Sequence, residues 1–297
     1  MGDSTAHLKL MLCGGLAGAT AKTVCNPLER VRILCQTGES RGFVQTFASI
    51  INKEGVVGLW RGNLSSVVRI IPNKGVLFMT NDTIKTLVGT DQHHFSPWKS
   101  IMAGSLAGVM ASLTTYPLDL VRGRLSGFLG SESRYKSIWG TITLTVKEEG
   151  FFALYRGMGP TLFGCFPYEG IKFGVYDFMK SRIPDDATPF ASTVFGLVSG
   201  AAAGTIAGVV MFPNDTVRRR LQVQGARQTT DSKAVERYTG ALDCYAKIFR
   251  QEGIRAFYRG LPATLIRTVP NATIQFGTFD LLKSIMGLAD AKFKVSD

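Results

Sequence analysis

The pattern of apolar and polar positions divides the chain into three similar thirds, and each third opens on a long run of apolar and small residues. These runs cover residues 8–25, 101–116 and 192–212. Each is close to the ~20 residues with which an α-helix crosses a bilayer. Their glycines follow the spacing G-x-x-x-G, which in lipid lets two helices approach closely; they are Gly14 and Gly18, Gly104 and Gly108, and Gly200, Gly204 and Gly208. We therefore expect three membrane helices rather than soluble helices that need thin packing.

A second, amphipathic helix is predicted to close each third, over residues 64–85, 161–180 and 264–283. A charge inside a membrane-spanning helix is costly unless it faces protein or water. We therefore expect the charged side chains of these helices to face a water-filled cavity. The charges that interrupt the apolar residues are Arg69, Glu169, Lys172 and Arg267.

Shorter amphipathic segments lie between the paired helices, at residues 42–53, 137–148 and 240–251. Their pattern is typical of helices that lie on one surface of a membrane. The predicted fold is thus an all-α membrane protein with six transmembrane helices and three short helices. An even number of spans puts both termini on the same side.

Three motifs recur in the same order and with the same internal spacing in each third. The first is Pro-x-acid-x-x-base, the second is Glu-Gly followed by aromatic-Arg-Gly, and the third is Asp-x-x-Lys. Chance does not plausibly supply three motifs in one order three times, so we interpret the chain as three repeats. Their predicted bounds are 1–90, 91–185 and 186–290, followed by a tail at 291–297.

The first motif predicts a ring of ion pairs. A proline within a helix removes a backbone hydrogen bond and kinks the axis, so Pro27, Pro117 and Pro213 should swing the helix ends inward. The acid of one repeat can then meet the base of the next. The predicted pairs are Glu29 with Arg122, Asp119 with Arg218, and Asp215 with Arg32. Such a ring would close a pore at one face.

The third motif predicts a second ring at the opposite face. Its pairs are Asp82 with Lys283, Lys85 with Asp177, and Lys180 with Asp280. Partly buried ion pairs contribute little net energy unless their geometry is good, which suits gates that substrate binding must shift. The alternative is that these pairs are static ties between helices, but that alternative does not explain why both ends carry one.

Composition fits a membrane protein with a polar interior. The hydrophobic fraction is 45% and the mean hydropathy is +0.12. Lys and Arg number 34 against 22 for Asp and Glu, a net charge of +12. A basic excess can favour nucleic acid or anionic partners, but no nucleic-acid motif is present. We therefore expect an anionic solute or a membrane surface as partner, and no nucleic acid.

Other functional classes find little support in the sequence. The five cysteines are odd in number and lack a C-x-x-C, so neither a disulfide framework nor a zinc site is indicated. There is no P-loop, dinucleotide-binding glycine pattern or nucleophile elbow, so we expect no enzyme, no cofactor and no metal. The N-terminus fits neither a secretory signal nor an Arg-rich transit peptide, and any targeting information is expected to be internal.

On these three motifs, and over essentially the whole chain, the sequence resembles the mitochondrial carrier family. The resemblance implies a six-helix barrel with pseudo-threefold symmetry that exchanges solutes across the mitochondrial inner membrane, and we expect a monomer. It makes the first motif a matrix gate and Asp-x-x-Lys a cytoplasmic gate. Gln36 and Gln222 match a glutamine that braces the matrix gate, whereas Ser126 does not, and Asn81 replaces an aromatic residue of the third motif.

The resemblance also implies cardiolipin bound where short helices and second helices begin. Helix N-termini present free N–H groups and a positive dipole end, which suit a phosphate. The matching glycines are Gly42, Gly62, Gly157, Gly240 and Gly260.

Substrate contacts in the family lie on the second helices. Counting the same distance back from the aspartate of each third motif leads to Arg69, Gly164 and Arg267. The arginines offer planar forks for phosphate or carboxylate, and Gly164 with Cys165 predicts an uncharged slot for an adenine ring. Further contacts are expected from Lys74, Tyr168 and Lys172, whose alternative role is to line the cavity wall.

This arrangement resembles carriers of coenzyme A and adenine nucleotides, and residues 156–168 are most similar to the coenzyme A and ATP-Mg/phosphate branches. Residues 215–220 are similar to the ADP/ATP exchanger, but Leu221, Gln222 and Val223 follow where that pattern has three Met. Strict ADP/ATP exchange is therefore not expected. Several alternatives stay open: another phosphorylated or carboxylate metabolite, a peroxisomal nucleotide or coenzyme A carrier, and a repurposed proton leak or membrane receptor.

Overall fold

The computed structural model describes residues 2–39, 42–87, 97–130, 135–182, 189–227 and 238–286, and within these ranges the chain forms helices and turns without strands. One order of elements occurs three times. A long helix comes first, a short helix and a 3-10 turn follow, and a second long helix ends the series. The predicted alternation of long and short helices is confirmed.

The first series contains α1 (Gly2–Thr37), α2 (Phe43–Glu54), η1 (Val56–Trp60), α3 (Asn63–Val68) and α4 (Ile70–Leu87). The second contains α5 (Pro97–Ser126), α6 (Ile138–Glu149), η2 (Phe151–Tyr155) and α7 (Met158–Lys180). The third contains α8 (Pro189–Val210), α9 (Phe212–Arg227), α10 (Ala241–Glu252), η3 (Ile254–Tyr258) and α11 (Leu261–Ile285).

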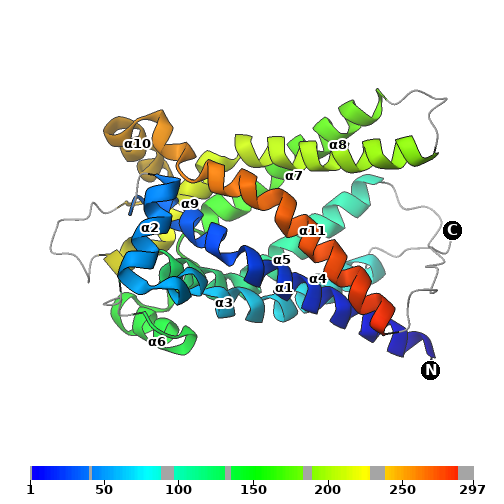
Figure 1. Cartoon of the computed structure of the whole chain (residues 1–297), viewed down its shortest axis with the longest axis horizontal. Coiled ribbons are helices and arrows are strands. Elements are labelled where there is room, and N and C mark those ends of the chain that lie inside the picture. The colour runs from blue at the N-terminus through cyan, green and yellow to red at the C-terminus, as the bar shows by residue number, and fades with distance from the viewer. Residues whose placement is uncertain are drawn as a thin grey trace.

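The short helices gather at one end of the molecule (Figure 1). Helices α2, α6 and α10 lie there, while the start of α1 and the end of α11 lie at the opposite end. Helix α1 packs along α11, α4 along α5, and α7 along α8. The second long helix of one series is thus the neighbour of the first long helix of the next.

Two long helices are divided where a proline interrupts the hydrogen-bond ladder. Met211 separates α8 from α9, because Pro213 has no N–H to donate to the carbonyl of residue 209. Arg69 separates α3 from α4 in the same way, because Pro72 cannot donate to residue 68. Pro27 and Pro117, by contrast, lie inside α1 and α5, which continue through them.

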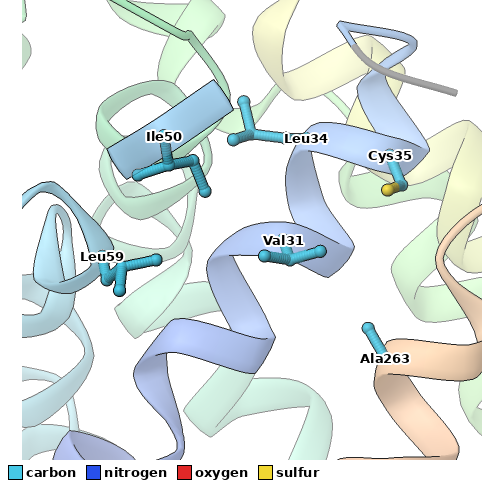
Figure 2. Close-up of a cluster of buried hydrophobic side chains, with 6 residues drawn as sticks. All are labelled: Val31, Leu34, Cys35, Ile50, Leu59 and Ala263. Atoms are coloured by element: carbon cyan, nitrogen blue, oxygen red, sulfur yellow. The ribbon is translucent and has the colours of Figure 1, made fainter. Parts of the chain in front are cut away.

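The buried apolar core lies at the end that holds the short helices. One cluster brings Val31, Leu34 and Cys35 of α1 against Ile50 of α2, and Leu59 and Ala263 complete it (Figure 2). A second cluster joins the end of α5 to Val223 of α9, and a third joins α9 to α10 and η3. Residues from neighbouring series share the first two clusters, whereas the third lies within one series, so packing between series at this end comes from the first two.

Most glycines of the G-x-x-x-G pattern do not bring two helices together. A Cβ would meet no atom within 4 Å at six of the seven positions, which are Gly14, Gly104, Gly108, Gly200, Gly204 and Gly208. The close helix approach expected from the spacing is therefore wrong at these six positions, whereas a Cβ on Gly18 would lie in ordinary contact with the Ile70 side chain at 3.8 Å.

None of the described helices is both long enough and apolar enough to qualify as a membrane span.

Candidate functional site

Three ion pairs link the long helices α1, α5 and α9 near the short-helix end. Arg122 Nη2 lies 3.3 Å from Glu29 Oε1. Arg218 pairs with Asp119, and Arg32 pairs with Asp215. These are the three pairs predicted from the first motif, and we call the six residues the ion-pair ring. The carboxylates are largely covered, with 6% of the Glu29 side chain and 1% of the Asp119 side chain exposed.

Two glutamines brace the ion-pair ring as the resemblance implied. Gln36 Nε2 donates to Asp215 Oδ2 at 3.1 Å, and Gln222 Nε2 donates to Asp119 Oδ2 at 2.9 Å. Ser126, at the matching position of the second series, instead donates its hydroxyl to the Arg61 carbonyl at 3.0 Å. The Glu29–Arg122 pair thus has a serine where the other two pairs have a glutamine.

The two candidate substrate arginines also reach the ring acids, which sequence reasoning missed. Arg69 Nη1 lies 2.9 Å from Asp119 Oδ1, and Arg267 Nε lies 3.1 Å from Glu29 Oε2. The repeats predicted that residues 69, 164 and 267 lie at one depth along the second helices. The long arginine side chains nevertheless place their guanidinium groups beside the ring acids. Asp215 lacks the equivalent arginine because position 164 is a glycine.

Gly164 is buried, whereas its neighbour Cys165 is exposed. A Cβ on residue 164 would overlap Nδ2 of Asn214 and would lie 3.6 Å from the Met211 methyl. The space beside the glycine is therefore occupied by a side chain of α9. Gly164 and Cys165, like Asn214 and Met211, line the larger of the two cavities described next, and the uncharged slot for an adenine ring stays a prediction.

Two cavities lie among the long helices. The larger has a volume of about 1000 Å³ and is lined from α5, α7, α8 and α9, with Asp215 and Arg218 of the ion-pair ring among its lining residues. The smaller, of about 380 Å³, is lined by α8 and the first half of α11, and Arg267 faces it. Arg32 and Tyr168 line both cavities, so the two spaces adjoin.

The remaining candidate substrate residues differ in their surroundings. Tyr168 lines both cavities. Lys172 Nζ lies 3.0 Å from Glu169 Oε2, so this lysine has an acidic partner on its own helix. Lys74 is exposed and belongs to the lining of neither cavity.

The structure describes only some of the side chains of the second predicted ring. Lys180 and Asp280, whose side chains the structure describes, are both exposed and form no ion pair with each other. The other two predicted pairs, Asp82 with Lys283 and Lys85 with Asp177, each include a side chain that lies outside the described residues.

The five candidate lipid-binding glycines all stand at helix N-termini without a side-chain cap. Gly42 and Gly240 precede α2 and α10. Gly62, Gly157 and Gly260 precede α3, α7 and α11 with φ of 81°, 86° and 92°. In the last two, a Cβ would come within 3.0 Å of the Arg218 carbonyl and 2.9 Å of the Arg32 carbonyl, respectively. Backbone geometry alone therefore requires glycine there.

A further set of ion pairs surrounds the glutamate of each Glu-Gly motif. Arg30 Nη2 lies 2.7 Å from Glu54, Arg124 pairs with Glu149, and Arg220 pairs with Glu252. Each arginine also donates to a backbone carbonyl of the next series: Phe128 at 3.2 Å, Gln222 at 3.2 Å and Gln36 at 3.1 Å. Sequence reasoning gave these arginines no role, although Arg124 and Arg220 stand at the same place in their motifs.

The chain is similar to known proteins over nearly its whole length. The family model described as mitochondrial carrier protein matches residues 3–92, 93–187 and 191–289. The chain is 36% identical to Mitochondrial carrier protein CoAc1 of Zea mays, over 95% of this chain and 88% of that one. It is 33% identical to Mitochondrial adenine nucleotide transporter ADNT1 of Arabidopsis thaliana, over 97% and 89%.

A plastid protein is similar as well. The Probable envelope ADP,ATP carrier protein, chloroplastic, of Arabidopsis thaliana is 31% identical, over 97% of this chain and 74% of that one. The family match covers nearly the whole chain in three consecutive segments. The chain belongs to the mitochondrial carrier protein family, whose members are transporters and not enzymes.

Proposed function

We propose that the protein exchanges coenzyme A or an adenine nucleotide across the mitochondrial inner membrane by alternating access. The observation that carries the proposal is that Arg69 and Arg267, at one depth on two second helices, are each held by a carboxylate of the ion-pair ring. The names of the relatives, CoAc1, adenine nucleotide transporter and ADP,ATP carrier, support this solute class.

Competition for these arginines couples solute binding to the ring. A guanidinium binds phosphate and carboxylate through the same forked donors. When a phosphate takes Arg69, Asp119 keeps Arg218 and Gln222. When a phosphate takes Arg267, Glu29 keeps Arg122 and Arg32. In this proposal solute binding removes one charged contact from the closed network and so shifts the population towards the state in which the ring is open.

The two ends of the molecule carry opposite gates in this proposal. The ion-pair ring, with Gln36 and Gln222, is the matrix gate, and the residues of Asp-x-x-Lys form the cytoplasmic gate. The ring pairs are made while Lys180 and Asp280 stand unpaired. This contrast supports a state that is closed to the matrix and open to the cytoplasm.

The long helices span the bilayer in this proposal, as a six-helix barrel of three repeats (1–90, 91–185 and 186–290). Leu12 of α1, Leu106 of α5 and Val198 of α8 are each more than half exposed. Apolar side chains exposed along several neighbouring helices favour contact with lipid. The contacts that recur from each series to the next support the pseudo-threefold symmetry.

The larger cavity suits a nucleotide-sized anion. Its volume of about 1000 Å³ lies at the upper end of ordinary ligand pockets. We assign the adenine ring to the wall of this cavity around Cys165 and Tyr168. We assign the phosphates to Arg267, which lines the adjoining smaller cavity, and to Arg69, which pairs with Asp119 of the ring and lines neither cavity. Lys172 can bind a phosphate of the solute once its ion pair with Glu169 is broken. Lys74 stays a candidate for contact with the solute outside the two cavities.

Cardiolipin is the proposed lipid partner and the monomer the proposed functional unit. The helix starts at Gly42, Gly62, Gly157, Gly240 and Gly260 have no side-chain caps. Their free N–H groups can therefore donate hydrogen bonds to the phosphate oxygens of a lipid headgroup.

Transport by purified protein in liposomes tests the function. Vesicles loaded with one candidate are offered labelled coenzyme A, ADP, ATP, phosphate, keto acids and amino acids in turn. We expect uptake of coenzyme A or an adenine nucleotide, and Arg267→Ala should abolish it. Uptake of keto acids or amino acids alone, with the nucleotides inert, would refute the proposal.

The membrane in which the protein acts needs its own test, because one relative is named chloroplastic. A fluorescently tagged full chain should co-fractionate with inner mitochondrial membrane markers. Co-fractionation with peroxisomes or plastids would show that the protein acts in that organelle and would contradict the proposed mitochondrial location.

A further inference from the structure

We propose that Asn214 is a positioning residue of the transport cycle: its side-chain amide ties α7 to α10 beside the ion-pair ring, and residue 164 is a glycine so that this amide can fit. The proposal rests on the proposed exchange function for the meaning of the cycle. The contacts themselves, and part of the test, do not depend on which solute moves.

The first step is steric. A Cβ on Gly164 would overlap Nδ2 of Asn214, so even alanine forces α7 and α9 apart or displaces the amide. Gly164 is buried at this contact although Cys165 beside it is exposed. The glycine is therefore explained by a protein contact across two repeats, and a solute contact is not needed to account for it.

The second step is that both ends of the Asn214 amide are already bound to protein. Nδ2 donates to the Pro160 carbonyl on α7 at 2.8 Å, and Oδ1 accepts the Tyr245 hydroxyl of α10 at 3.1 Å. A carbonyl on one side and a hydroxyl on the other fix which way the amide points. The amide thus links the helices, with one of its two N–H groups donating to Pro160. Because Asn214 also lines the larger cavity, its test has to separate this link from a contact with the solute.

Packing and burial hold Tyr245, the hydrogen-bond partner of Asn214, in place. Its ring stacks on Phe257 at a centroid distance of 5.7 Å. Burial raises the pKa of Tyr245 to about 12, so the hydroxyl keeps its proton at neutral pH and can donate to Asn214.

The third step connects the link to the ring. Asn214 directly precedes Asp215, whose carboxylate pairs with Arg32 and accepts from Gln36. The matching residues of the other two repeats are Leu28 and Leu118, which cannot form such a link. Asp215 is also the ring acid without a second-helix arginine. The link through Asn214 therefore ties the second repeat to the third, whereas Arg69 ties the first to the second and Arg267 ties the third to the first.

Rescue by a second substitution tests the steric step. Gly164→Ala should lower the melting temperature of the purified protein by several degrees and change the labelling rate of Cys165 by a maleimide; the other four cysteines are buried. Adding Asn214→Ala removes the overlapping amide. The double variant should therefore regain at least about half of the drop in melting temperature, and its Cys165 labelling rate should return at least about half of the way to the wild-type rate. Gly174→Ala, on the same helix with open space around it, is the control without effect. A double variant as defective as Gly164→Ala alone overturns the proposal.

Kinetics in liposomes test the positioning role. Asn214→Leu, which copies the other repeats, should lower the maximal exchange rate about tenfold with KM changed less than about twofold, because in this proposal the amide positions α9 and does not bind the solute. Tyr245→Phe, on the short helix, should act in the same direction. A rise in KM with an unchanged maximal rate would instead make Asn214 a solute contact and overturn the proposal. If no adenine-containing solute is exchanged at all, the proposed function is wrong. The rescue of the melting temperature still tests whether Asn214 packs against Gly164.

Discussion

Arg69 and Arg267 each have two possible partners, a carboxylate of the ion-pair ring in this structure and a phosphate in the proposed transport cycle. Arg69 uses both sides of its guanidinium, with Nη1 at 2.9 Å from Asp119 and Nε at 3.3 Å from the Thr115 hydroxyl. A single ammonium cannot make both contacts in the same plane. The function of this residue therefore depends on the fork as well as on the charge.

Arg69→Lys should consequently lower the exchange rate about tenfold, equivalent to ~1.4 kcal/mol of lost stabilisation. The measurement is initial uptake of the best solute into loaded vesicles. Arg250→Lys, an exposed position on α10, is the matched control. Equal rates in Arg69→Lys and wild type would show that charge alone suffices.

Two of the three pairs of the ring should respond differently to charge reversal. Arg32→Asp should abolish exchange, and Asp215→Arg added to it should restore a large part. Glu29→Arg combined with Arg122→Glu should recover less, because Glu29 is also the partner of Arg267. Vesicle exchange by the four single and two double variants measures both recoveries. Equal recovery by the two double variants would argue against the second role of Glu29.

At the scale of helices, the start of each second helix is fixed by a left-handed glycine packed against the next repeat. Gly157 has φ of 86°, and a Cβ there would lie 3.0 Å from the Arg218 carbonyl. The same conformation recurs at Gly62 and Gly260. These positions hold the short-helix end together whether or not a lipid binds there.

Gly157→Ala should therefore destabilise the protein by about 1–3 kcal/mol, through a strained backbone and the close carbonyl. Gly159→Ala, two residues further into α7 with open space around it, should be neutral or slightly stabilising. Melting curves of the detergent-solubilised variants provide the comparison. Similar melting temperatures for the two alanine variants would contradict the packing described for Gly157.

The short helix α10 carries a pH-sensitive tie. The hydrogen bond from Arg220, with Arg259 nearby, holds the pKa of Glu252 below its usual value. Because the folded pKa lies below the unfolded one, this stabilisation is present at neutral pH and is lost as the pH falls through the acid range. Glu252→Gln should thus melt lower than wild type at about pH 7, and the gap should narrow towards about pH 4. A gap that stays constant with pH would rule out the ionised pair as its source.

The repeats explain which elements the sequence could predict. Alternation of apolar and amphipathic segments predicted α2, α6 and α10 within one or two residues, and the first motif predicted which acid meets which arginine. The breaks at Arg69 and Met211 depend on single prolines, and the sequence does not tell which proline interrupts a helix and which is accommodated, as Pro27 is. Contacts across repeats that break the symmetry, such as Asn214 on Gly164, were likewise beyond a pattern-based argument.

Over the whole molecule, the structure combines a closed ion-pair ring at the short-helix end with cavities that adjoin it from the other side. Two of the three ring acids also hold the arginines proposed to receive the solute. In the proposed function the ring and the binding site therefore share residues, so that binding of the solute changes the contacts that close the ring. We propose this sharing as the physical basis for coupled exchange.

Counter-exchange in proteoliposomes tests this account most directly. Labelled ADP and labelled coenzyme A are each offered to vesicles that contain the same unlabelled solute and to vesicles that contain buffer alone. The account predicts rapid uptake of at least one of the two into loaded vesicles, little into empty ones, and none in either case for Arg267→Ala. Nucleotides and coenzyme A that stay outside loaded vesicles, while a keto acid or amino acid exchanges, would contradict it.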